Sequence, residues 1–215
     1  MRLVTRPPEP EILTLKSAAW NQQWVDLKQA NPKATFSWYE YEKKSAREWV
    51  LPSLRAMTEG HCTFCDAFPV EDTSMEPIEH FRPKHDPRFF HLAFAWNNLY
   101  YCCDRCQSHK GGQWEDNLIA PDHERYAFGD FFEFDVASGE IHPNRFAAED
   151  LRSGAANTIR IFGLNEGGRP GKRRRALLKW TRSTFRDLND EPYRDFIECG
   201  SLSAAIESGL ENAAP

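Results

Sequence analysis

The chain lacks any long apolar run. None of its hydrophobic stretches approaches the ~20 residues that a membrane-spanning helix needs, and residues 1–8 lack the apolar core of a secretory signal peptide. We therefore expect a cytoplasmic protein with no membrane partner. The chain also lacks an excess of positive charge, because 32 acidic and 27 basic residues give a net charge of −5. The total charge by itself argues against nucleic acid as a partner, so the distribution of charge has to decide.

Aromatic residues, in contrast, are abundant. The 215 residues include 7 Trp, 15 Phe and 6 Tyr, and 40% of the chain is hydrophobic. This composition excludes a disordered chain and predicts a folded globular protein. The length fits one large domain, or one compact domain with a helical appendage.

Hydrophobic spacing predicts helices at both ends of the chain. After a proline-rich arm over residues 1–12, apolar positions predict a helix over 13–30 that ends before Asn31. A second helix is expected to begin after Ser37, to be kinked or restarted at Pro52, and to end at Glu59 and Gly60. Further helices are predicted over residues 149–162, 170–188 and 191–210.

Alternation around a Gly-containing turn predicts a β-hairpin from Phe131 to Phe134 and from Glu140 to His142. The expected fold class is therefore α+β. We divide the chain into an N-terminal arm with helices (residues 1–60), a motif-rich core (61–125), and a hairpin with a C-terminal helical region (126–215).

Five of the six cysteines lie between positions 62 and 106. Cys62 and Cys65 form one CxxC pair, and Cys103 and Cys106 form a second. Two such pairs in a chain without an export signal favour a tetrahedral structural Zn²⁺ site over disulfides, a redox pair or buried core thiols. Cys102 does not fit this spacing and is expected in the core, and Cys199 is expected as a free thiol.

The residues between and beside the two pairs carry the chemistry. Glu79 and His80 follow the first pair, Asn98 precedes the second, and Gln107 follows it. This is the order of the HNH endonuclease motif. An imidazole is suited to activating water at neutral pH, so His80 is the candidate general base. Glu79 is a candidate oxygen ligand for a catalytic Mg²⁺ or Mn²⁺, and Asn98 would orient His80.

The segment Ile78-Glu79-His80-Phe81-Arg82-Pro83-Lys84 resembles the signature of the PtuB-type HNH nucleases of Septu and retron-linked antiphage systems. The likeness continues through residues 96–99, 103–111 and 163–165. It implies a zinc-stabilised ββα-metal (HNH) core, flanked by N- and C-terminal helices. It also implies a nuclease that acts with an ABC/SMC-like ATPase partner, PtuA, and in retron-linked systems with a reverse transcriptase and its msDNA.

Within this pattern the expected catalytic set is His80, Asn98, Gln107 and Lys110. The family usually has Asn where this chain has Gln107, so His109 is the alternative ligand of the catalytic metal. If His80 is not the base, then His109, His85 and His91 are the next candidates. The substrate is DNA or RNA, including tRNA.

A basic segment near the C-terminus offers a contact surface for phosphate. From Arg169 to Arg186 there are eight basic residues and no acidic one. On a helix, five of them would share one face: Lys172, Arg175, Lys179, Arg182 and Arg186. We expect this basic face, with Arg82 and Lys84, to bind nucleic acid. The alternatives are a solvated helix face and a dock for an acidic protein.

Two other functions stay open. The chain could be a catalytically silent zinc module that binds nucleic acid or a protein partner. It could also be a restriction-type or mobile-element HNH nuclease that acts alone. Metal-dependent cutting that is lost in His80→Ala separates the first from a nuclease, and co-purification with an ATPase separates the second.

Overall fold

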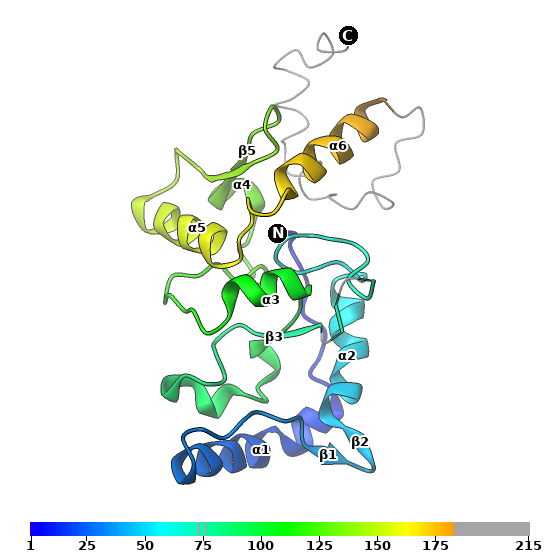
Figure 1. Cartoon of the computed structure of the whole chain (residues 1–215), viewed down its shortest axis with the longest axis vertical. Coiled ribbons are helices and arrows are strands. Elements are labelled where there is room, and N and C mark those ends of the chain that lie inside the picture. The colour runs from blue at the N-terminus through cyan, green and yellow to red at the C-terminus, as the bar shows by residue number, and fades with distance from the viewer. Residues whose placement is uncertain (73, 76, 183–215) are drawn as a thin grey trace. The chain divides into compact units, whose positions relative to one another are not determined.

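The α+β class is confirmed by a computed structural model, in which helices alternate with three small antiparallel sheets (Figure 1). The structure describes residues 1–72, 74–75 and 77–182, with side chains described as far as Leu178. The backbone contacts group into two compact units. Unit 1 comprises Met1–Val4, Phe64–Phe68 and the chain from Glu115 onward, and unit 2 comprises Thr5–Thr63 and Pro69–Trp114.

Unit 2 begins with the long helix α1 and a small hairpin. The predicted first helix is confirmed as α1 (Glu11–Ala30), whose buried face includes Trp20 and Trp24. The strands β1 (Glu40–Tyr41) and β2 (Lys44–Ser45) then pair antiparallel. The two residues of their turn, at positions 42 and 43, both have positive φ.

The second helix begins later than the sequence indicated. We expected it to start after Ser37, but α2 spans Ala46–Met57. Its start is fixed by a capping box, in which Ser45 Oγ accepts from the Arg47 amide and Glu48 accepts from the Ser45 amide. The helix continues through Pro52 without a restart. It ends at Met57, shortly before the predicted end at Glu59 and Gly60, which both adopt positive φ.

The rest of unit 2 is the segment between and around the cysteine pairs. Strand β3 (Ile78–His80) pairs antiparallel with β4 (Leu99–Tyr101), and the register places His80 opposite Leu99. Two 3₁₀ turns, η1 (Pro87–Leu92) and η2 (Trp96–Asn98), connect the strands. Helix α3 (Asp104–Lys110) follows directly after β4. The order is therefore strand, strand, helix, with every β3 and β4 residue buried.

Unit 1 contains the predicted hairpin and the C-terminal helices. Strands β5 (Phe132–Phe134) and β6 (Ile141–Pro143) pair antiparallel, after the short helix α4 (Phe128–Phe131). The predicted helix over 149–162 is confirmed as α5 (Glu149–Ile161). Phe64 stacks on Phe162 with ring centroids 3.8 Å apart. In this unit Arg2 also pairs with the buried Asp66, with Arg2 Nε 3.0 Å from Asp66 Oδ1.

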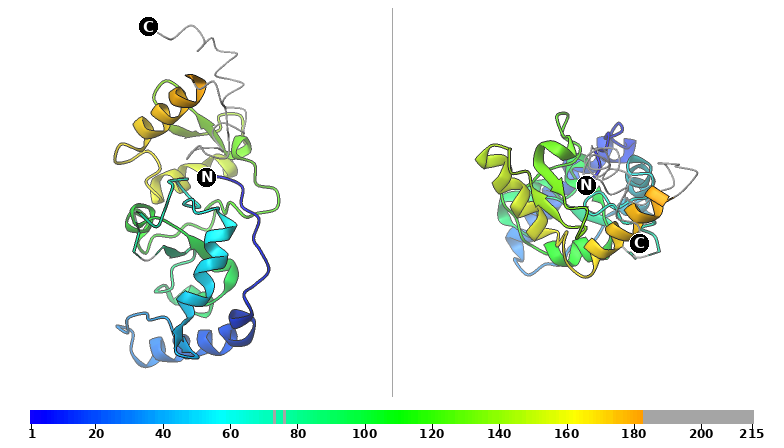
Figure 2. Two further views of the ribbon diagram at one scale, coloured as in Figure 1. Left: turned by 90° about the vertical axis from the view of Figure 1, so that its right-hand side faces the viewer. Right: turned by 90° about the horizontal axis from the view of Figure 1, so that it is seen from above.

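The last described helix, α6, spans Arg169–Arg182. Figure 2 shows α5 and α6, in yellow-green and orange, as separate helices joined by a turn. Gly139, with a φ of 80°, lies so close to α6 that a Cβ would be 2.1 Å from the Pro170 carbonyl oxygen. The predicted helix over 191–210, and the predictions for Arg186 and Cys199, lie outside the described residues. No helix in the described ranges is long and apolar enough to cross a membrane.

Candidate functional site

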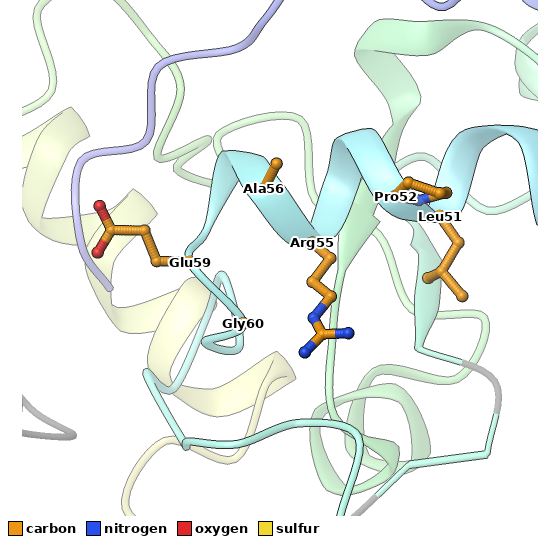
Figure 3. Close-up of a pocket in the computed structure, with 6 residues that line it drawn as sticks. All are labelled: Leu51, Pro52, Arg55, Ala56, Glu59 and Gly60. Atoms are coloured by element: carbon orange, nitrogen blue, oxygen red, sulfur yellow. The ribbon is translucent and has the colours of Figure 1, made fainter.

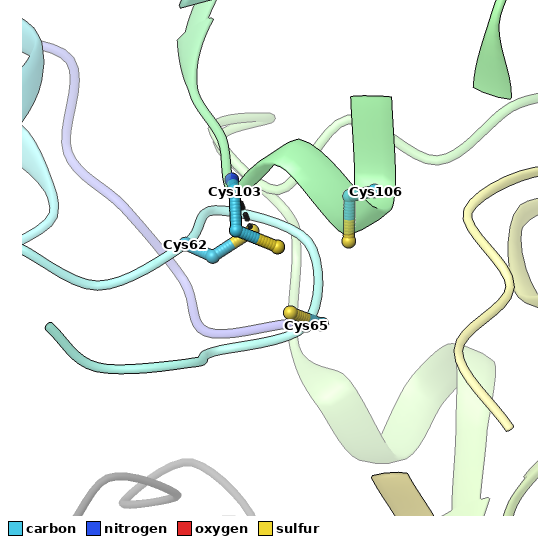
Figure 4. A group of neighbouring side chains, drawn as sticks. All are labelled: Cys62, Cys65, Cys103 and Cys106. Atoms are coloured by element: carbon cyan, nitrogen blue, oxygen red, sulfur yellow. Dashed lines mark hydrogen bonds between the residues drawn. The ribbon is translucent and has the colours of Figure 1, made fainter. Parts of the chain in front are cut away.

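The four cysteines of the two CxxC pairs lie together, as their spacing predicted. All four are buried, and their sulfur atoms all lie within 4.8 Å of one another (Figure 4). The first pair is tied to the end of β4, because the Thr63 amide donates to the Tyr101 carbonyl (2.9 Å). The Cys103 amide donates to the sulfur of Cys62 at 3.4 Å.

This geometry fits a tetrahedral metal. Metal–sulfur distances of about 2.3 Å separate the sulfurs of a tetrahedral site by about 3.8 Å, so the cluster has to contract little to bind one ion. The four cysteines can therefore hold a structural metal such as zinc. Bound zinc would link the first CxxC pair to the start of α3.

Cys102 lies outside this group, as expected. Its side chain is fully buried and its sulfur donates to the Cys103 carbonyl at 3.5 Å. Burial raises the pKa of the Cys102 thiol well above its ordinary value. The neutral thiol is therefore the stable form, and Cys102 behaves as a core residue.

His80 ends β3 as a buried imidazole with two close polar neighbours. It is only 3% exposed. Its Nε2 lies 2.9 Å from the Ala93 carbonyl oxygen, and its Nδ1 lies 3.4 Å from Nζ of Lys84. A carbonyl can only accept, so Nε2 carries the proton and the electron pair of Nδ1 accepts from the Lys84 ammonium. Burial, aided by the Lys84 charge, holds the pKa of His80 well below its ordinary value, and the imidazole is neutral.

Glu79 and Lys110 form a buried ion pair behind His80. The Lys110 ammonium, on α3, donates to Glu79 Oε1 (2.7 Å) and to the His80 carbonyl (2.8 Å). The Lys110 side chain is fully buried and the Glu79 side chain is 11% exposed. Burial raises the pKa of Glu79, and the Lys110 charge opposes that shift. Lys110 is therefore positioned to hold β3 on α3 and not to contact a substrate.

Asn98 holds the hairpin through three side-chain hydrogen bonds. Its Oδ1 accepts from the Arg82 amide (2.7 Å), and its Nδ2 donates to the carbonyls of Arg82 (3.1 Å) and Leu92 (2.9 Å). Asn98 is fully buried. These bonds fix the chain on both sides of the β3–β4 connection. Replacing Asn98 by a residue without both a donor and an acceptor would leave buried backbone groups unpaired.

The two candidates for the last HNH position lie on α3 but face different surroundings. Gln107 donates through Nε2 to the Cys102 carbonyl (3.0 Å). His109 is exposed, and its carbonyl accepts from Gln113. The four cysteines are the one group of three or more His, Cys, Asp or Glu side chains that the described residues bring together for a metal. Glu79 would have to leave Lys110 before it could bind a second metal.

Arg82 and Lys84 follow β3 in the chain, and both side chains are half-buried. The Arg82 guanidinium lies over the Trp114 ring, 5.4 Å from its centroid. The Lys84 ammonium lies over the Phe36 ring at 5.0 Å. Both cations therefore lie beside aromatic rings and are close to His80 in the chain.

The basic segment of α6 divides into buried and exposed residues. Arg169 donates to the carbonyls of Phe162 and Gly163, and Arg173 donates to the carbonyls of Leu164 and Gly139. Both arginines are buried, so they hold the α5–α6 turn and the hairpin. Lys172 and Arg175 are exposed, as the predicted basic face requires. The side chains of Lys179 and Arg182, and all of Arg186, lie outside the described residues.

Sequence reasoning missed three residues at this site. Phe36 and Trp38 lie against the His80 ring, at centroid distances of 5.0 Å and 5.5 Å. Arg6 clamps the turn that contains Asn98, donating to the carbonyls of Trp96 (2.7 Å) and Leu99 (3.1 Å). The aromatic residues at positions 36 and 38 are two apart in the sequence, and this spacing indicated an extended segment with one side buried. Nothing in the sequence distinguished Arg6 from other basic residues.

A separate pocket of about 440 Å³ lies along α2 (Figure 3). It is lined by Leu51, Pro52, Arg55, Ala56, Glu59 and Gly60. None of the candidate site residues lines it. Its one cation, Arg55, is paired with Glu71 (2.7 Å). The pocket therefore belongs to the surface of α2 and not to the candidate site.

A curated protein similar to the chain is the Septu protein PtuB of Bacillus mycoides (strain KBAB4). It is 33% identical over 123 residues, which cover 50% of this chain and 40% of the relative. The chain therefore spans less than half of that relative's length. No protein-family model matches the chain. The similarity supports a relationship to Septu proteins across half of the chain.

Proposed function

We propose that the chain is an HNH (ββα-metal) endonuclease that hydrolyses phosphodiester bonds of DNA or RNA in an antiphage defence system. The observation that supports this most is the assembly of the motif on one hairpin. Glu79 and His80 lie on β3, Asn98 precedes β4, and α3 begins directly after Cys103 and contains Cys106. The 33% identity to a Septu protein PtuB supports the defence role.

In this mechanism His80 accepts the proton of the attacking water. The imidazole is neutral, and its Nε2 proton is held by the Ala93 carbonyl, so Nδ1 is the basic atom. Asn98 fixes the connection that carries Ala93 and Arg82. Lys84, whose ammonium lies 3.4 Å from His80 Nδ1, and Arg82 would bind the scissile phosphate.

A catalytic Mg²⁺ or Mn²⁺ remains part of the proposal, and it would supply Lewis-acid stabilisation of the leaving oxygen. The described side chains fit such an ion poorly, because Glu79 is ion-paired and His109 and Gln107 do not form a site with it. The zinc cluster, in contrast, fits its ion and would stabilise the hairpin and α3.

The proposed partner is an ATPase of the PtuA kind, as the likeness to the Septu protein implies. A retron reverse transcriptase with its msDNA is the partner expected in a retron-linked system. Co-expression with a genomic neighbour that encodes an ATPase, followed by co-purification, tests the first of these. An HNH nuclease that acts alone would cut without it.

The central experiment is a cleavage assay on plasmid DNA and total RNA with Mg²⁺ or Mn²⁺. His80→Ala should lower single-turnover cleavage by a factor of ~10²–10⁴, the usual cost of a lost general base. Zinc content and nucleic-acid binding should remain nearly unchanged. His123→Ala, at an exposed histidine with no proposed role in the chemistry, is the matched control. Equal cutting by wild type and His80→Ala would remove His80 from the mechanism.

The second candidate function is a zinc module that binds nucleic acid or a protein without cutting. The burial of His80 favours it, since a 3% exposed imidazole contacts no substrate in this arrangement. That protein would bind nucleic acid in the same assay but would release no cleaved product with either metal.

A further inference from the structure

Aromatic rings from the segment after α1 cover His80. The Trp38 ring stacks on the imidazole at 5.5 Å with an interplanar angle of 25°, and the Phe36 ring meets it edge-on at 5.0 Å and 76°. Phe94 packs behind both rings, 5.3 Å from Phe36 and 5.7 Å from Trp38. The cover leaves His80 3% exposed.

This arrangement is incompatible with the chemistry proposed for His80. A general base has to come within about 2.6–3.2 Å of the proton that it accepts, or reach it through one water. A phosphodiester of a nucleic acid cannot approach a ring that is enclosed by Trp38, Phe36 and the Ala93 carbonyl. The cover has to move before His80 can act.

The covering segment is held by ring contacts and not by its backbone. Among the described residues, positions 35–38 make no backbone–backbone hydrogen bond and belong to no helix or strand. The segment is anchored on both sides. Lys28 donates to the carbonyls of Pro32 and Ala34, and the Tyr39 carbonyl accepts from the Ala46 amide at 2.7 Å. Residues 35–38 can therefore move away from His80, while the anchored residues on both sides stay in place, without breaking a sheet or helix.

We propose that residues 35–38, which we call the aromatic lid, are an autoinhibitory cover that keeps His80 inaccessible until the lid opens. The autoinhibition rests on the proposed function, because only a nuclease can be held inactive by a closed lid. The closed lid itself rests on contacts alone. The two parts can therefore be tested apart.

The first measurement needs no nuclease activity. Diethyl pyrocarbonate acylates neutral, accessible imidazoles, and peptide mass spectrometry gives the rate at each histidine. In the wild-type full chain, His80 should react far more slowly than the exposed His91 and His123. In Trp38→Ala the rate at His80 should rise by a factor of about 2–13, which is the loss of an aromatic pair worth ~0.5–1.5 kcal/mol when 1.4 kcal/mol is a factor of ten.

Trp49→Ala is the matched control. Trp49 is half-buried like Trp38, but it contacts Tyr41 and Lys44 and has no ring contact with His80. It should leave the rate at His80 unchanged. If Trp38→Ala fails to fold, Trp38→Leu keeps apolar bulk, removes the stack on the imidazole and provides the same comparison. Melting curves establish which variants are folded.

The second measurement is single-turnover cleavage of plasmid DNA and total RNA with Mg²⁺ by the same proteins. An autoinhibitory lid predicts faster cleavage in Trp38→Ala than in wild type and Trp49→Ala. The closed lid is contradicted if His80 of the wild type reacts as fast as His91. It is also contradicted if the rate at His80 is unchanged in folded lid variants. If the lid variant exposes His80 to the reagent but cleaves no faster than a wild type that does cut, the lid is not autoinhibitory. If no protein cuts although the lid variant unmasks His80, the proposed function fails and the closed lid stands.

Discussion

The buried Glu79–Lys110 pair provides the sharpest test of how this core is held together. Lys110→Met keeps most of the apolar stem of the lysine and removes its charge. The ammonium lost has two acceptors, Glu79 Oε1 at 2.7 Å and the His80 carbonyl at 2.8 Å. We expect a loss of about 3–5 kcal/mol in the free energy of unfolding, the usual result of leaving one buried charge without its partner.

An exposed ion pair with the same N–O distance is the control. Arg55 Nη2 and Glu71 Oε1 are also 2.7 Å apart, but their side chains are 58% and 44% exposed. Solvent screens such a pair, so Arg55→Met should cost no more than ~1 kcal/mol. The N–O distances are equal, so the contrast reports the burial of the Lys110 pair together with its second acceptor, the His80 carbonyl.

The pH dependence of the Lys110→Met penalty has a defined sign. Burial raises the pKa of Glu79 in the folded protein, and removal of Lys110 raises it further. The folded variant then binds a proton more readily than the unfolded chain does. Its penalty should therefore be small below the unfolded pKa of ~4.3 and grow as pH rises above it.

Urea titrations at several pH values measure these effects through the midpoint and slope of unfolding. The double variant Glu79→Leu with Lys110→Met should recover much of the lost stability, since an apolar pair of similar volume is often as stable as a buried ion pair. Recovery should stay incomplete, because the His80 carbonyl still lacks its donor. A Lys110→Met penalty equal to that of Arg55→Met would refute the reasoning.

Three further predictions concern the metal, the basic face and the histidine. Cys106→Ser should lose the bound zinc and the soluble fold, whereas Cys102→Ser should keep one zinc per chain in elemental analysis. Arg175→Ala should weaken nucleic-acid binding and reduce the salt-dependence slope by about 0.9 for duplex DNA, whereas the buried Arg173→Ala should lower the melting temperature. The His80 imidazole should stay neutral in an NMR titration well below pH 6.5, and its contribution to stability should fall as pH drops below ~6.5, where the unfolded chain takes up the proton. A normal titration of His80 would contradict its burial.

The sequence predicted much of the secondary structure, because local signals dominate there. The periodic helices α1 and α5 and the β5–β6 hairpin are confirmed close to their expected bounds. The start of α2 was wrong by several residues, because the Ser45 capping box lies beyond the point where apolar spacing first became helical. Caps are set by a few specific hydrogen bonds, which periodicity does not report.

The cysteine cluster could also be predicted, and for a related reason. A CxxC turn brings its own two sulfurs together, so two pairs have only to meet once. The same holds for the absence of Cys102 from the cluster, which follows from its spacing. The sequence by itself therefore determined which residues form the candidate metal site.

The surroundings of the candidate catalytic residues depended on tertiary structure. The sequence put Glu79 beside His80, but only the fold showed that Glu79 is paired with Lys110 from α3. The sequence shows Arg173 within a basic segment, but in the structure this side chain is buried and donates to the carbonyls of Gly139 and Leu164. Such partners are far apart in the chain, and no local pattern records which of several lysines or arginines reaches a buried acceptor.

The aromatic lid shows most directly what the sequence reveals and what only the tertiary structure decides. The residues Phe36 and Trp38 and the motif histidine at position 80 were all visible in the sequence. That two rings lie against that imidazole depends on how the segment after α1 folds back over β3. Sequence motifs determined which residues carry the proposed chemistry. Only packing between distant segments decided whether those residues are accessible, because burial is a property of all the neighbours at once.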